Sequence, residues 1–148
     1  MTFASSLYQE VILDHAKNPN NFGELDQYTC TAEGNNPMCG DQLTVYVNVK
    51  DNIVSDVSYR ARGCAISVAS ASIMSQMIKG KTLEEVNILF DKFHRLCMGE
   101  DIEEDEDTET LQALSGVSKF PTRVKCATMS WHAVKEAIHD EKQITLDN

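Results

Sequence analysis

The period of the hydrophobic pattern changes near residue 64, and this change restricts the fold more than any other feature of the sequence. Residues 43–49 alternate strictly between apolar and polar side chains, which is the pattern of a half-buried β-strand. The alternation resumes over residues 53–62 after Asp51-Asn52, a pair that suits a tight turn. The sequence therefore predicts a β-hairpin here, and a shorter strand is expected over residues 28–33.

From residue 65 onward the pattern is helical. One helix is predicted over residues 65–78, and a second runs from the capping box of Thr82 and Glu85 to about Cys97. A terminal helix is predicted where apolar residues recur at 127, 131, 134 and 138. A first helix with Ser6 as its cap and a short amphipathic piece near residue 111 complete the set. Three early strands and about five helices predict a single α+β domain over residues 1–148.

The charge is concentrated in one segment. The net charge is −10, but residues 100–110 hold eight acids, which leaves only −2 for the rest of the chain. We expect this segment to be an acidic loop insertion at about 98–110. Because the sequence has no basic stripe that could neutralise phosphates, neither nucleic acid nor a membrane surface is an expected partner.

The five cysteines point to chemistry inside a reducing compartment. The N-terminus lacks the apolar stretch of a secretory signal, and the longest uncharged run, residues 63–78, is short and rich in serine, so a cytoplasmic protein is expected. Cysteines there are ligands, nucleophiles or core residues rather than disulfides. Their placement along the chain separates the five into two groups.

Three cysteines lie at the ends of predicted elements, where ligands can converge. Cys39 lies in the loop before the long strand, Cys64 at a strand–helix junction, and Cys126 at the start of the predicted terminal helix. From placement alone, a shared metal or reactive site and simple core packing both remain open for these three. Cys30 and Cys97 lack such positions and are predicted to pack in the core.

Each of the three cysteines lies within a longer motif. The segments "NNPMCGD", "GCAISVASASIM", "IKGKTLEE" and "FPTRVKCATMSWHAVKEAI" resemble the U-type iron–sulfur assembly proteins, the SufU/IscU (NifU N-terminal) family. The similarity runs from the first helix to about residue 138, and it implies a three-stranded antiparallel sheet packed by helices. Lys125 stands where the scaffold branch of the family has a histidine, and the 61 residues between Cys64 and Cys126 exceed the scaffold spacing. Both features resemble the SufU branch.

The resemblance implies a zinc site and a reactive thiol. Carried over residue by residue, the family's zinc ligands fall on Cys39, Asp41, Cys64 and Cys126, a set that suits tetrahedral Zn²⁺. Cys39 is also implied to be the sulfur acceptor, and hence the catalytic residue of a zinc-dependent sulfurtransferase.

The same resemblance implies partners and leaves alternatives. The sulfur donor would be a pyridoxal-phosphate-dependent cysteine desulfurase of the SufS type, and a downstream iron–sulfur scaffold would receive the sulfur. Arg123 and Lys125 are candidate contacts with the desulfurase, or simply solvated residues. One alternative is a scaffold that binds a [2Fe–2S] cluster on the same cysteines, since thiolates accept both metals. Another is a binding module with a structural zinc and an inert Cys39.

Overall fold

The computed structural model describes residues 3–37, 40–100, 102, 111–112 and 114–147 of the chain. Its sheet has three antiparallel strands in the order β1-β2-β3, namely β1 (Cys30–Asn36), β2 (Asp41–Lys50) and β3 (Ile53–Arg62). Between β2 and β3, Asp51 and Asn52 both have positive φ angles, 53° and 65°, as the tightest hairpin turn requires. The predicted hairpin is confirmed.

The first strand differs in position from its prediction. It begins at Cys30 rather than Tyr28 and continues to Asn36, which pairs with Asp41 of β2. Asparagine and glycine favour turns, so the local sequence gave no strand signal over residues 34–36. Pairing with β2 supplies the hydrogen bonds that hold this polar stretch extended.

Four α-helices and one 3₁₀ helix are present in the described part of the chain, close to the predicted number of about five. They are α1 (Phe3–Lys17), α2 (Ala65–Ile78), α3 (Leu83–Cys97), the 3₁₀ helix η1 (Ser115–Lys119) and α5 (Pro121–Asp147). The capping box at the start of α3 is confirmed, since the Thr82 hydroxyl accepts from the Glu85 N–H and the Glu85 carboxylate accepts from the Thr82 N–H. The α+β class is confirmed as well.

Two helices begin earlier than predicted. Helix α1 starts at Phe3, so Ser6 lies within the helix instead of capping it. Helix α5 starts at Pro121, which places Cys126 in its second turn and not at its N-terminus. Proline is well tolerated in the first helical turn because its missing N–H has no partner there. The prediction that Cys126 lies at the start of the terminal helix was therefore wrong.

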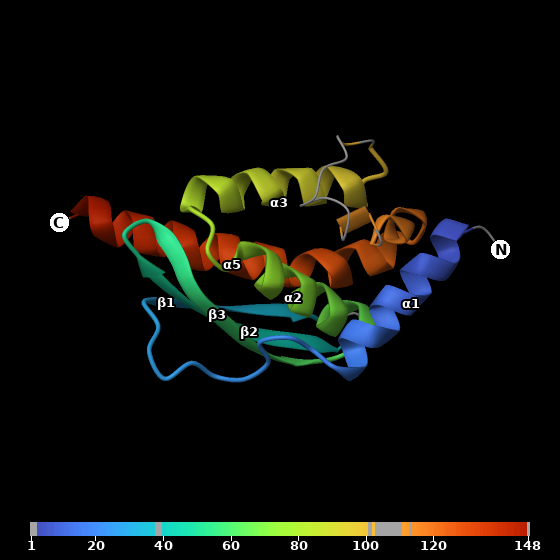
Figure 1. Cartoon of the computed structure of the whole chain (residues 1–148), viewed down its shortest axis with the longest axis horizontal. Coiled ribbons are helices and arrows are strands. Elements are labelled where there is room, and N and C mark those ends of the chain that lie inside the picture. Colours follow the sequence, from blue (N-terminus) through green and yellow to red (C-terminus); the bar gives the residue numbers. More distant parts are fainter. Residues whose placement is uncertain (1–2, 38–39, 101, 103–110, 113, 148) are drawn as a thin grey trace.

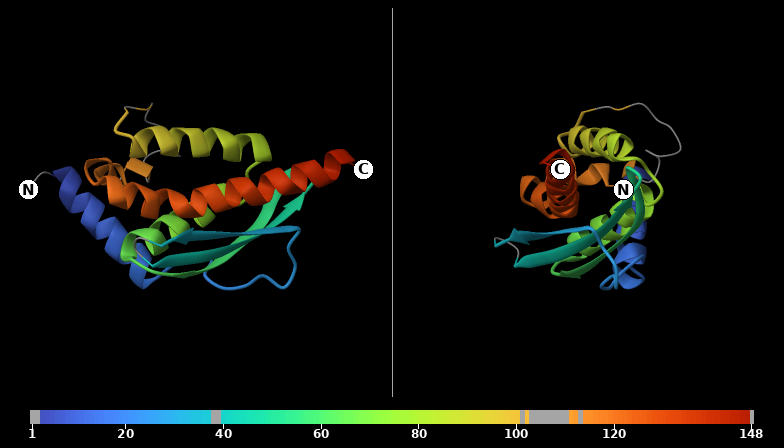
Figure 2. Two further views of the ribbon diagram at one scale, coloured as in Figure 1. Left: turned by 180° about the vertical axis from the view of Figure 1, so that it is seen from behind. Right: turned by 90° about the vertical axis from the view of Figure 1, so that its left-hand side faces the viewer.

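Helices α5 and α2 cover one face of the sheet, α3 lies outside them, and α1 lies at one end of the molecule (Figures 1 and 2). Helix α5 runs along β1 and β2, while α2 packs between α5 and β3. Helix α3 lies on α5 on the side away from the sheet, and α1 packs against α2. The result is a sheet layer, a central helical layer and a partial outer layer.

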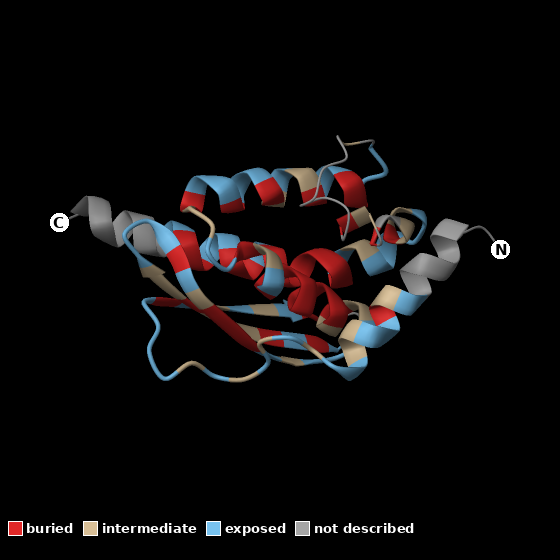
Figure 3. Ribbon diagram, viewed as in Figure 1, coloured by how far each residue is buried: buried red, intermediate tan, exposed pale blue. Residues whose placement is uncertain are grey.

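The core lies between the sheet and the central helices, where Figure 3 shows most of the buried residues. Val45 and Val47 of β2 are completely buried, and Trp131 of α5 is 1% exposed. The Trp131 ring stacks on Phe93 of α3 with 4.7 Å between ring centroids, which joins the outer helix to this core. Within the described part of the chain, no helix has both the length and the apolar character needed to cross a membrane.

Candidate metal centre

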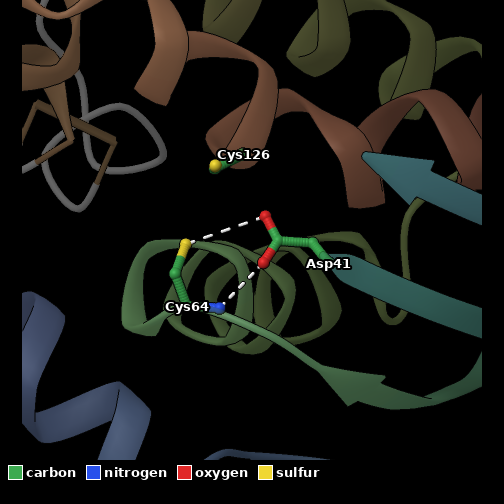
Figure 4. Close-up of side chains that lie close together, drawn as sticks. All are labelled: Asp41, Cys64 and Cys126. Carbon is green, nitrogen blue, oxygen red and sulfur yellow. Dashed lines mark hydrogen bonds between the residues drawn. The ribbon is translucent and has the colours of Figure 1, made fainter. Parts of the chain in front are cut away.

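Three side chains from three different elements meet at one end of the sheet. Asp41 begins β2, Cys64 is the N-cap of α2, and Cys126 lies in the second turn of α5. One carboxylate oxygen and the two sulfur atoms lie within 4.8 Å of one another. The side chains point toward a common centre (Figure 4). Asp41 and Cys126 are fully buried and Cys64 is half-buried, so the cluster is largely shielded from water.

Helix α2 holds the Asp41 carboxylate through both of its oxygens. The backbone N–H of Cys64 donates to Oδ1 at 2.8 Å, and the Ser67 hydroxyl donates to Oδ2 at 2.7 Å. Burial by itself raises the pKa of Asp41, but the hydrogen bonds from Ser67 and from the Cys64 backbone, with smaller ones from both thiols, outweigh it and lower the pKa overall. The buried carboxylate is therefore anionic at neutral pH.

Gly63 lets the carboxylate approach the chain this closely. Its φ angle is +148°, a conformation that side-chain-bearing residues rarely adopt. A Cβ atom at this position would collide with Asp41 Oδ1 and would come within 2.9 Å of the Asp41 Cα. Only glycine fits between the end of β3 and the carboxylate.

The two thiols have different surroundings. The Cys64 sulfur lies 3.8 Å from Asp41 Oδ2 and 3.5 Å from the Ser67 hydroxyl. The Cys126 sulfur lies 3.8 Å from the Thr122 carbonyl of its own helix and accepts from the Asn36 side-chain amide at 3.5 Å. Asn36 is itself buried and ends β1, so the end of β1 also contributes to this region.

Of the predicted ligands, Cys39 lies outside the described residues. Gly40 separates it from Asp41 in the sequence. The other two cysteines are in the core, as predicted. Cys30 approaches the Val47 carbonyl of β2, and burial raises the pKa of the Cys97 thiol to about 12.

The candidate partner contacts, Arg123 and Lys125, are both exposed in the first turns of α5. Lys125 also lines a shallow pocket of about 380 Å³ between β1 and α5. None of the described histidines belongs to the cluster of potential ligands.

The donor set fits a soft or borderline divalent metal. Two thiol sulfurs and one carboxylate oxygen are typical zinc ligands, and zinc sites are most often completed by a fourth ligand in a tetrahedral arrangement. Sulfur ligands would also accept an iron–sulfur cluster. The buried anionic carboxylate favours a cation at this position, because an isolated charge in the interior is costly.

Sequence reasoning missed three residues that shape the site: Ser67, Asn36 and Gly63. Ser67 follows Cys64 by three residues, which is the spacing between an N-cap residue and the third residue of a helix. This spacing is the one local signal that could have indicated a role for Ser67. Asn36 is 90 residues from Cys126, and nothing in the sequence links the two.

The fold and the buried Asp–Cys–Cys cluster define a class of small α+β proteins with a potential metal-binding site at one end of a three-stranded sheet. Residues 7–95 match the family described as NifU-like N terminal domain. The chain belongs to this family, which confirms the resemblance to the SufU/IscU proteins.

Similar proteins and structures agree with this assignment. The zinc-dependent sulfurtransferase SufU of Bacillus subtilis is 41% identical over 93% of this chain and 92% of its own length. The iron–sulfur cluster assembly scaffold protein IscU of Thermotoga maritima is 37% identical over 89% of this chain and 92% of its own. The crystal structure of a putative iron–sulfur cluster assembly scaffold protein for the SUF system from Fervidobacterium islandicum superposes with a TM-score of 0.83. It is 30% identical, covering 89% of this chain and 96% of that one.

Proposed function

We propose that this protein is a zinc-dependent sulfurtransferase that accepts sulfur from a cysteine desulfurase for iron–sulfur cluster assembly. The observation that carries the proposal is the buried cluster of Asp41, Cys64 and Cys126, whose ligand atoms lie within 4.8 Å of one another. The 41% identity to a relative named as a zinc-dependent sulfurtransferase supports the same activity.

Four residues would hold the metal: Cys39, Asp41, Cys64 and Cys126. A bound zinc ion keeps a coordinating thiol deprotonated near neutral pH, and the thiolate is the nucleophilic form of cysteine. The described residues provide a rigid base for the site, because two of the three are buried and each comes from a different element. Only Cys39 comes from the loop between β1 and β2.

Cys39 would carry the transferred sulfur. Its thiolate attacks the outer sulfur of the persulfide on the desulfurase cysteine and forms a new S–S bond. The S–S bond of the donor breaks, and its electron pair leaves with the desulfurase cysteine as a thiolate. The products are a Cys39 persulfide and the free desulfurase thiolate, so one sulfur atom moves and no external oxidant or reductant is consumed.

Two exposed cations near the site are candidate contacts with the desulfurase. Arg123 and Lys125 are exposed in the first turns of α5, one on each side of the half-buried Val124 and close to Cys126 in sequence. Basic groups at the rim of an interface steer an acidic partner more than they add to its affinity. A downstream iron–sulfur scaffold would then receive the sulfur from Cys39.

A second candidate function is that of a scaffold assembling a [2Fe–2S] cluster on the same thiolates. Relatives named as IscU scaffold proteins support it, at 38% identity in Streptococcus pyogenes and 37% in Thermotoga maritima. The residue before Cys126 argues against it. Lys125 stands there, and a lysine ammonium offers only hydrogen-bond donors and no lone pair for a metal. By the family resemblance, the scaffold branch has a histidine at this position, which can serve as a ligand.

Metal analysis of the purified protein distinguishes the zinc-dependent sulfurtransferase from the cluster scaffold. We expect one zinc per chain and no visible absorption band, because a closed set of four ligands suits tetrahedral zinc. Cys64→Ala and Cys126→Ala are expected to lose zinc, and the matched control Cys97→Ala, which removes a buried thiol outside the site, is expected to retain it. A brown protein with stoichiometric iron and sulfide after anaerobic purification would favour the scaffold instead.

A further inference from the structure

Ser67 touches two of the three clustered residues, and neither the metal-ligand set nor the sulfur-transfer step uses it. It is the third residue of α2 and is 1% exposed. Its hydroxyl donates to Asp41 Oδ2 at 2.7 Å and lies 3.5 Å from the Cys64 sulfur. A buried hydroxyl directed at a carboxylate is a strong, charge-assisted hydrogen-bond donor.

The Asp41 carboxylate receives one donor on each oxygen. The Cys64 N–H occupies Oδ1 at 2.8 Å and the Ser67 hydroxyl occupies Oδ2. Two donors fixed on the same helix turn prevent the carboxylate from rotating about its Cβ–Cγ bond. Without the hydroxyl, only the backbone N–H would set its orientation.

The oxygen that Ser67 holds is the one beside the thiol. Asp41 Oδ2 lies 3.8 Å from the Cys64 sulfur, in the orientation of a thiol-to-carboxylate hydrogen bond. A metal that displaces the thiol proton would leave this oxygen facing the thiolate, with the Ser67 hydroxyl still bound to it. Hydrogen-bonded partners of this kind orient ligands and raise metal affinity.

We propose that Ser67 is a positioning residue that fixes the Asp41 carboxylate for metal binding. The inference rests on the proposed metal site. It assigns to Ser67 an effect that passes through Asp41 alone, which distinguishes it from a serine that merely stabilises the start of α2.

The expected effect is on zinc affinity. Loss of such a partner typically lowers metal affinity by about 10–100-fold, so Ser67→Ala is expected to weaken Zn²⁺ binding by this factor. Affinity is measured on the metal-free full-length protein by competition with a chromophoric zinc chelator. Ser75→Ala is the matched control, because it removes another buried hydroxyl of α2. The partners of that hydroxyl are the Asn21 amide and the carbonyls of Ser72 and Asn20, away from the site.

A double-mutant cycle tests whether the effect passes through Asp41. Asn in place of Asp41 keeps the size of the side chain but removes the anionic ligand. In the Asp41→Asn background, Ser67→Ala is expected to change zinc affinity by no more than about twofold, which is about the error within which such cycles are additive. An equal loss in both backgrounds would make Ser67 a structural residue and overturn the proposal.

The remaining outcomes are also decisive. If Ser67→Ala binds zinc as tightly as the wild type, the proposal is wrong while the metal site stands. If the wild type itself binds no zinc, both the metal site and the role of Ser67 fall. Alanine is the best helix former, so the metal-free variant is expected to fold. Failure to fold, seen by circular dichroism, would again assign Ser67 a structural role.

Discussion

The Asp41 carboxylate is the side chain on which the geometry of the site depends most. It is completely buried, yet it is held by hydrogen bonds from α2 that lower its pKa. Its position depends on the absence of a side chain at Gly63. A substitution there tests the site without removing any proposed ligand.

Gly63→Ala is expected to abolish stoichiometric zinc binding. The added Cβ would collide with Asp41 Oδ1, and the φ angle of +148° strains any residue except glycine. Overpacking and backbone strain of this kind cost about 1–3 kcal/mol each, so the melting temperature should fall as well. Zinc content and thermal melting are the measurements. Gly80→Ala, whose φ is also positive but whose Cβ would meet no described atom within 4 Å, is the control. A Gly63→Ala protein with full zinc would contradict this account of the site.

The individual residues of the site differ in how far the sequence could reveal them. Placement at the ends of elements singled out Cys39, Cys64 and Cys126, and the resemblance to the family added Asp41. The role of Ser67 follows from its hydrogen bond to Asp41, which is 26 residues away in the sequence. The role of Asn36 follows from its contact with Cys126. Such contacts arise only when separate elements pack together, so the sequence alone could not show them.

The end of α1 and the segment that follows it are attached to α2 through partly buried polar groups. The Ser72 hydroxyl lies 2.8 Å from His15 Nδ1 and accepts from the Asn20 N–H, and the Ser75 hydroxyl accepts from the Asn21 side-chain amide at 3.0 Å. The serines that made α2 look too polar for a membrane span thus anchor α1. The packing of α1 is therefore expected to respond to the protonation of His15.

Folding stability is expected to fall as the pH drops below about 6.5, in part through His15. Burial lowers the pKa of His15, and the nearby Asp14 only partly offsets this effect. Below the ordinary histidine pKa the unfolded chain binds a proton that the folded chain does not, so acid favours unfolding until the lowered pKa is reached. The melting temperature measured between pH 7.5 and 5.5 should decline less in His15→Gln than in the wild type. Parallel declines in the two proteins would show that His15 contributes nothing to the pH dependence.

Local signals explain which elements were predicted well. The alternation over residues 43–62 and the capping box of Thr82 and Glu85 each specify an element through neighbouring residues, and both are confirmed. The end of β1 and the start of α5 were misplaced. Pairing with β2 extends β1 through a polar stretch that has no strand signal of its own. Helix α5 begins at Pro121, because proline is tolerated in the first turn of a helix, whereas the apolar pattern predicted a later start.

Across the whole molecule, the proposed metal would join the start of β2, the start of α2 and the second turn of α5. The hydrophobic core lies beside this site and contains the packed rings of Trp131 and Phe93. Periodicity was sufficient to predict the α+β class and the three strands. The placement of α5 and α2 on one face of the sheet depends on long-range packing that no local pattern records.

Zinc removal is expected to lower the melting temperature without unfolding the protein at room temperature. A ligand at 100 times its dissociation constant stabilises a protein by about 2.7 kcal/mol, which corresponds to roughly 5–10 °C for a chain of this size. Melting curves with and without a chelator give the shift, and the far-UV circular dichroism at 20 °C should remain. Cys64→Ala, which lacks a proposed ligand, should show no further effect of the chelator. Identical melting of the wild type with and without chelator would argue against a metal that bridges the three elements.

Sulfur transfer to Cys39 is tested by mass spectrometry of the protein after incubation with its cysteine desulfurase and free cysteine. We expect the wild type to gain the mass of one sulfur atom, located in the peptide that contains Cys39, and to accelerate sulfide release when a reductant is present. Cys39→Ser should show neither effect, whereas Cys97→Ala should show both. If Cys39→Ser still accelerated the desulfurase, or if the wild type gained no sulfur on Cys39, the sulfurtransferase account would be contradicted. A structural zinc or a cluster scaffold would then be the better explanation of the site.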